Sequence, residues 1–161
     1  MLKQAEENKG KIVDLDAVLF AIWFHDIVYK SSKKDNEEKS AKLAQSILQK
    51  FSIEEERINK VYELILSTKA HQIKLEEDKD NAFLLDLDLY ILGQDWKVYQ
   101  VYIRNIRKEY SLYPDFLYRP GRRKVLEGFL ERKTLYFTKK YQDIFEVKAR
   151  QNLEREIKLL Q

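Results

Sequence analysis

Apolar residues recur along the chain at the three- and four-residue spacing of amphipathic helices. We expect seven helical segments with short joints: 14–29, 36–51, a third between Ser52 and about His71, 81–92, 96–113, 122–133 and 138–160. The predicted inward residues of the first three segments include Ile22 and Trp23, then Ala41, Ala44, Ile47, Leu48 and Phe51, and then Ile58, Val61, Leu64, Ile65 and Thr68. No internal repeat or low-complexity tract separates them. The pattern therefore predicts an all-α fold, a compact helical bundle of about seven helices forming one domain over residues 1–161.

Several joints carry specific signals. Ser52 with Glu55 makes a capping-box pattern before the third helix. Gly93 follows the very apolar segment 81–92 and predicts a left-handed C-cap there. The segment 74–80 is acidic and polar, which favours a solvated loop, and we read 114–121 as a joint after a helix stopped by Pro114.

Composition narrows the function classes. Only 4 Gly and 2 Pro occur in 161 residues, which disfavours β-sandwiches, barrels and Gly-rich phosphate loops. The absence of cysteine excludes a disulfide framework, a zinc ribbon and a thiol nucleophile. Lys and Arg total 30 against 27 Asp and Glu, a balance that argues against a dedicated nucleic-acid surface. No secretory leader pattern and no membrane-length apolar run are present, so we expect a cytoplasmic protein outside the membrane.

A histidine and a carboxylate stand side by side in AIWFHDIVY. His25 and Asp26 follow an apolar run, and buried polar groups need partners. One interpretation is a core histidine bonded to a neighbouring backbone carbonyl, with Asp26 capping the next loop. The other is a pair of metal ligands, one nitrogen and one oxygen, presented by the end of a helix. The pair alone leaves both open.

Two aspartates interrupt the apolar segment LLDLDLYIL. Asp86 and Asp88 lie two positions apart and therefore on opposite sides of a helix, so at most one of them points at any one site. Asp88 shares its stripe with leucines and is the carboxylate more in need of a cation. A salt bridge to Lys or Arg and a metal ion would both meet that need.

Taken as a series, several segments resemble a known family. They are WFHDIVYKSSKKDNEEKSAKLA, ILSTKAHQ, FLLDLDLYILG, YIRNIRKEY, GRRKVLEGFLERKTLYFT and ARQNLEREI. In order and spacing they are similar to the bacterial subgroup of the HD superfamily of predicted metal-dependent phosphohydrolases, from about Asp14 to the C-terminus. The resemblance implies an all-helical fold in which a divalent ion binds a small phosphate ester, such as a nucleotide, and activates water.

The resemblance also implies site residues. His25 and Asp26 match the central His-Asp doublet, and Asp88 matches the distal aspartate, with Asp86 the weaker candidate. A mixed nitrogen and oxygen site suits Mn, Fe, Co, Ni or Zn, and carboxylates also hold Mg. His71 lies where this subgroup has an additional histidine, which orients phosphate or completes the ligand shell; a partly exposed helix-end residue is the alternative.

Glu37 and Glu38 open the helix that follows the doublet. Glu37 is the candidate to take a proton from the attacking water. Acidic residues in the first turn of a helix are also what the helix dipole favours without any catalysis. Both interpretations stay open.

The chain departs from the family pattern at its start. The family's first metal-binding histidine lies upstream of the doublet, and residues 1–24 contain no histidine. We therefore expect a domain truncated at its N-terminus, with weak metal affinity and little hydrolytic activity. An apolar strip around Leu15, Val18, Leu19 and the face of the central helix 81–92 should then be uncovered, and through it the chain should form homo-oligomers.

Two other function classes compete with the phosphohydrolase. A non-catalytic helical binding module on the same scaffold fits the missing histidine. Nucleic-acid binding would use Tyr102, Arg104, Arg107 and Tyr110, although tyrosines at this spacing more often pack at the edge of a core.

Overall fold

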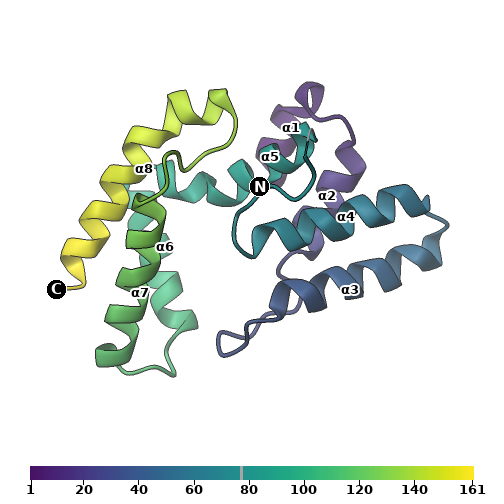
Figure 1. Cartoon of the computed structure of the whole chain (residues 1–161). Coiled ribbons are helices and arrows are strands. Elements are labelled where there is room, and N and C mark those ends of the chain that lie inside the picture. The colour runs from purple at the N-terminus through teal and green to yellow at the C-terminus, as the bar shows by residue number, and fades with distance from the viewer. Residues whose placement is uncertain (77) are drawn as a thin grey trace. The chain divides into compact units, whose positions relative to one another are not determined.

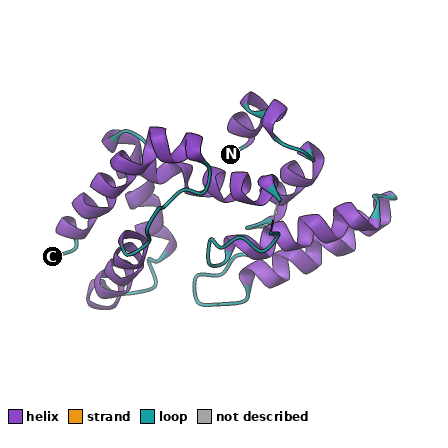
Figure 2. Ribbon diagram, turned by 45° about the horizontal axis from the view of Figure 1, so that its top comes forward, coloured by secondary structure: helices purple, strands orange, loops and turns teal. Residues whose placement is uncertain are grey.

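The computed structural model describes residues 1–76 and 78–161, and these divide into two compact units, residues 1–88 and 89–161. Among the described residues every regular element is a helix, as Figure 2 shows, which confirms the predicted all-α class. The boundary between the units lies inside the apolar segment 81–92. The expectation of one domain over residues 1–161 stays a prediction.

In the part of the chain that the structure describes, none of the helices is both long enough and apolar enough to cross a bilayer.

Unit 1 is built around a pair of helices that lie side by side in Figure 1. Its elements are α1 (Leu2–Glu7), η1 (Lys9–Lys11), α2 (Leu15–Phe24), α3 (Asn36–Leu48), η2 (Gln49–Phe51), α4 (Glu55–Thr68) and α5 (Lys79–Asp88). Helices α3 and α4 pack closely because α3 presents the small residues Ala41 and Ala44, while α4 presents Val61 and Leu64, and all four are fully buried. The apolar faces predicted for these two helices are thus confirmed, except that Phe51 is 69% exposed.

The N-terminal residues form a helix that the sequence analysis did not predict. Helix α1 packs against α2, and its Ala5 is fully buried. Val18 is also fully buried, and Leu15 and Leu19 are half-buried. The predicted uncovered face is therefore wrong at Val18 and only partly present at Leu15 and Leu19, and self-association through it stays a prediction.

Helix α2 ends at Phe24, five residues earlier than predicted, because the following loop is held by α3. The Val28 N–H donates to the Ser40 hydroxyl at 3.1 Å, and the Lys30 N–H donates to Asn36 Oδ1 at 3.1 Å. Asn36 in turn donates to the Lys30 carbonyl at 3.0 Å. These side chains take the backbone groups that a longer helix would have paired internally.

The capping box predicted at Ser52 does not form. Ser52 is in the left-handed region, with φ of 54°, and the N-cap of α4 is Glu54, which makes no side-chain capping bond. The capping box with Glu55 is therefore absent. The segment 74–80, whose residue 77 lies outside the described residues, is not simply solvated, since Asp80 at the start of α5 is fully buried.

Unit 2 contains η3 (Leu89–Gly93), α6 (Trp96–Glu109), α7 (Asp115–Leu130) and α8 (Lys139–Leu159) among its described residues. The predicted helix 81–92 is thus divided between α5 and η3, and α7 begins seven residues earlier than predicted. Gly93 has no positive φ, so it is not a left-handed cap. Glycine is required there for space, because a Cβ atom would lie 2.6 Å from Phe145 Cβ and 2.8 Å from the Tyr136 hydroxyl.

A buried ionic group holds the helices of unit 2 together. Glu156 on α8 is fully buried and accepts hydrogen bonds from Tyr99 on α6, at 2.5 Å, and from Arg122 on α7, at 2.7 Å. Burial and the neighbouring Glu156 raise the pKa of Tyr99, so its hydroxyl stays protonated. Burial alone would lower the pKa of Arg122, but its bonds to Glu156 outweigh this effect and raise it.

Candidate functional site

Four titratable side chains from three segments of unit 1 meet near the ends of their helices, and we refer to them as the His–Asp cluster: His25, Asp26, His71 and Asp88. His25 Nε2 lies 3.3 Å from Asp26 Oδ2 and 3.8 Å from Asp88 Oδ1. His71 Nε2 lies 3.1 Å from Asp88 Oδ2. The candidate ligands predicted from the sequence therefore come together although 63 positions separate the first from the last.

His25 is oriented by its own helix. It is the C-cap residue of α2, and its Nδ1 lies 2.9 Å from the carbonyl oxygen of Ile22. A carbonyl only accepts, so Nδ1 carries the proton, and in a neutral ring Nε2 then holds a lone pair. The carboxylates of Asp26 and Asp88, which are acceptors as well, lie 3.3 Å and 3.8 Å from this nitrogen. Three acceptors so close together favour a proton or a cation between them.

The bond from His25 to the Ile22 carbonyl was also part of the alternative interpretation, in which His25 is a structural core residue. The bond itself does not separate the two, because metal-bound histidines commonly donate their second N–H to a backbone carbonyl. The position of Asp26 favours the interpretation as a ligand pair in part, because its side chain is 63% exposed and its Oδ2 lies 3.3 Å from His25 Nε2.

His71 is held in an unusual backbone conformation. It follows α4 with φ of 48°, in the left-handed region. The Gln72 N–H donates to the Ser67 carbonyl, and the His71 N–H donates to the Thr68 carbonyl. This pair of bonds is a Schellman motif, in which the left-handed position usually belongs to glycine. A histidine there is strained, and strain of this kind is often found at functional sites.

Asp88, rather than Asp86, belongs to the cluster. It is the last residue of α5, half-buried, and it contacts both histidine rings. Asp86 is fully buried two positions earlier in the same helix. This difference agrees with the expectation that only one of the two points at a given site.

Two helices end close to the cluster. His25 is the C-cap of α2, and His71 follows the end of α4, whereas α5 continues directly into η3 after Asp88. The C-terminus of a helix carries a partial negative charge. Together with the two carboxylates, these helix ends favour a cation over an anion.

The acidic residues that open α3 differ in their contacts. Glu38 forms an ion pair with Lys69 at the C-cap of α4, and this hydrogen bond lowers the pKa of Glu38. No described residue donates to the second, buried carboxylate oxygen of Glu38. Glu37 is half-buried and forms no hydrogen bond or ion pair with the described residues, so its role as proton acceptor stays a prediction.

Among the described residues, no group of three or more His, Asp and Glu side chains is already arranged to hold one metal ion. The members of the His–Asp cluster instead contact one another in pairs. Their ligand role therefore stays a prediction, and the donor set fits it: two imidazole nitrogens and two carboxylates, one of them on the protein surface.

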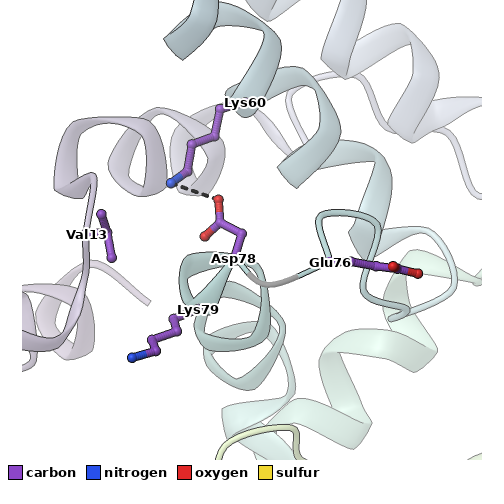
Figure 3. Close-up of a pocket in the computed structure, with 5 residues that line it drawn as sticks. All are labelled: Val13, Lys60, Glu76, Asp78 and Lys79. Atoms are coloured by element: carbon purple, nitrogen blue, oxygen red, sulfur yellow. Dashed lines mark ion pairs between the residues drawn. The ribbon is translucent and has the colours of Figure 1, made fainter.

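Sequence reasoning missed a second polar group, at the opposite ends of α2 and α5. Fully buried Asp80 accepts hydrogen bonds from the Val13 N–H at 2.7 Å and the Asp14 N–H at 2.8 Å. Lys60 bonds Asp80 at 2.7 Å and Asp78 at 2.9 Å. An open cavity of about 400 Å³ adjoins this group, and Figure 3 shows the Lys60–Asp78 ion pair at its wall.

The face proposed for nucleic acid is occupied by internal contacts at Arg107. Its guanidinium donates to Asp115 at 2.8 Å and to the carbonyls of Tyr110 and Tyr113. It also lies 4.7 Å from the centre of the Tyr118 ring. Arg107 thus organises the turn between α6 and α7.

Comparison with models of known protein families finds no match, and comparisons with curated proteins and with solved structures find no similar protein.

Proposed function

We propose that the His–Asp cluster binds a divalent metal ion and that the chain acts as a metal-dependent phosphohydrolase on small phosphate esters, such as nucleotides. The observation that carries the proposal is the set of contacts made by the His25 ring. Its Nδ1 is bonded to a backbone carbonyl, and two carboxylates lie within 3.8 Å of its Nε2. A neutral histidine in this position repels both of its neighbours unless a cation lies between them.

The electrostatic setting also favours a cation. Two helix C-termini and two carboxylates would repel a free phosphate group from the cluster. A phosphate ester would bind there only together with a positive ion. The resemblance of the sequence motifs to the HD superfamily supports the same reaction class.

Each member of the cluster has a role in this proposal. His25, Asp26 and Asp88 would hold the ion, and the bond to Ile22 would keep the His25 ring in the required tautomer. His71 would complete the ligand shell or donate a hydrogen bond to a phosphoryl oxygen, held in place by Asp88. Glu37 would accept a proton from the attacking water. The ion, when bound, would polarise the phosphoryl oxygens and acidify that water.

Metal binding can be tested by calorimetric titration of the chain with Mn²⁺, Co²⁺, Ni²⁺ and Zn²⁺. We expect weak binding, because three protein ligands leave the remaining coordination positions to water or buffer anions. His25→Ala and Asp88→Asn should weaken binding by about tenfold or more. Asp16→Asn is the matched control, since it removes the same charge from an exposed position on α2 and should leave the affinity unchanged.

Phosphate release from nucleoside monophosphates and p-nitrophenyl phosphate should be low and should follow the metal content. Asp88→Asn should abolish what activity there is, whereas Asp16→Asn should retain it. If none of the four ions binds, or if the affinity does not depend on His25 and Asp88, the metal site is wrong. A non-catalytic helical binding module would then be the better description.

A further inference from the structure

Helices α2 and α5 each end at the His–Asp cluster. Each contains ten residues; His25 follows α2 directly, and Asp88 is the last residue of α5. The two helices contact each other. Ten residues of α-helix span about 15 Å, so the cluster lies at one end of this helix pair.

Asp80 joins the other end of the pair. It lies in the first turn of α5, and its two carboxylate oxygens accept the N–H groups of Val13 and Asp14, which immediately precede α2. One tie therefore holds the N-terminal ends of both helices, while His25 and Asp88 meet at the C-terminal ends. The two helices must run in the same direction, and their axial register is set by the Asp80 carboxylate.

The tie is made by a fully buried charge. Asp80 is 0% exposed, and Lys60 and two backbone N–H groups provide its hydrogen bonds. Its own N–H donates to Asp78 Oδ1 at 2.8 Å. A buried ion pair is a weak source of stability compared with apolar packing of the same volume. Two N–H groups on one carboxylate do, however, restrict how one helix can slide along the other.

We propose that Asp80 is a positioning residue for the His–Asp cluster: by tying the start of α2 to the start of α5, it sets the distance between His25 and Asp88. This inference rests on the proposed function for its effect on metal binding. Its geometric content, a coupling between Asp80 and Asp88 along α5, holds in the metal-free chain as well.

Measuring both metal affinity and stability separates a positioning role of Asp80 from a merely structural one, because only a positioning role predicts a loss of affinity that does not follow the loss of stability. Asp80→Asn cannot accept both N–H groups, because one carboxylate oxygen is replaced by an amide donor. Lys60→Met keeps both N–H bonds but leaves the buried Asp80 charge without its cation, so it should lower the stability at least as much. Asp78→Asn is a milder second control: the amide oxygen can still accept the Asp80 N–H, while the negative charge next to Lys60 is lost.

We expect Asp80→Asn to weaken Co²⁺ binding by about tenfold and to change the visible absorption of the bound Co²⁺, measured well below the unfolding transition. Lys60→Met and Asp78→Asn should stay within about threefold of the original affinity and keep its spectrum. Equal affinity in Asp80→Asn and the original chain would overturn the proposal. So would a loss of affinity that follows stability across all three variants.

A double-mutant cycle tests the coupling without metal. Residues this far apart normally contribute additively to the unfolding equilibrium. If Asp80 positions Asp88, the effect of Asp88→Asn on the unfolding equilibrium constant should differ by about fivefold or more between the original chain and the Asp80→Asn variant. Asp35→Asn, which removes an exposed ion pair with Lys39 on α3, should show no such difference. Absence of metal binding in the original chain would defeat the proposed function, and additivity in this cycle would separately defeat the positioning role.

Discussion

His71 provides the most direct test of whether the cluster is maintained at a cost in backbone energy. With φ of 48° it occupies the glycine position of a Schellman motif after α4. We consider two replacements, His71→Gly and His71→Ala. Both remove the imidazole and its contact with Asp88, so the difference in stability between them isolates the backbone.

The magnitude follows from the left-handed conformation. An L-residue costs about 1–2 kcal/mol in that region, and glycine adopts it without a steric cost. The greater freedom of glycine in the unfolded chain offsets part of the gain. We therefore expect His71→Gly to be more stable than His71→Ala by about 1 kcal/mol. For the whole chain of 161 residues this corresponds to a difference of about 2–4 °C in Tm.

Thermal and urea unfolding, followed by far-UV circular dichroism, would measure this difference, provided that the two variants share the same denaturant dependence. Ser52 is the matched control, because it also has a left-handed backbone, with φ of 54°, but does not belong to the His–Asp cluster. Ser52→Gly should exceed Ser52→Ala in stability by a similar amount and leave metal binding unchanged. Equal stability of the two His71 variants, with the Ser52 pair clearly separated, would show that His71 is not strained.

Two further predictions concern packing and pH. Gly93→Ala should destabilise unit 2 by about 1–3 kcal/mol, because the new Cβ would overlap Phe145. Gly128→Ala, in open space on α7, should instead stabilise the protein by about 0.5–1 kcal/mol. Urea unfolding of the two variants should therefore show changes in stability of opposite sign. Burial would raise the pKa of Asp14, but its bonds to Arg57 and a backbone N–H outweigh this effect and lower the pKa. Because the pKa of Asp14 is lowered, ionised Asp14 stabilises the folded chain above the ordinary carboxyl pKa, and this stabilisation is lost as the pH falls through the pKa of the folded state. Arg57→Met should therefore flatten the acid side of a curve of stability against pH. An unchanged curve would contradict the assignment.

The apolar periodicity of the sequence predicted the helices well where burial is one-sided. For α4, the predicted inward residues Ile58, Val61, Leu64 and Ile65 are all buried. The same reasoning placed Trp23 inward, and it is 66% exposed. Periodicity works when one face packs against a neighbour along the whole helix, but it does not show where that neighbour ends.

The polar core was largely out of reach of the sequence. Asp80 stands in an acidic stretch, and Glu156 in a helix rich in charge, so both look solvated. The structure buries both completely, because each has a cationic partner from another helix: Lys60 for Asp80 and Arg122 for Glu156. Long-range pairing of this kind leaves no local signal.

The candidate site was predictable in part: the sequence indicates most of its residues, but not the helix ends that bring them together. His25, Asp26 and Asp88 could be inferred from interrupted apolar runs, since a charged group in such a run needs a partner. His71 could be inferred only from the family resemblance. How they meet depends on α2 ending at Phe24 and α5 at Asp88, and both ends were predicted several residues too late. The first end is set by Ser40 and Asn36 on α3, which bind the loop after His25. Contacts between helices therefore decide where each helix stops, and with that whether the two carboxylates reach the same imidazole.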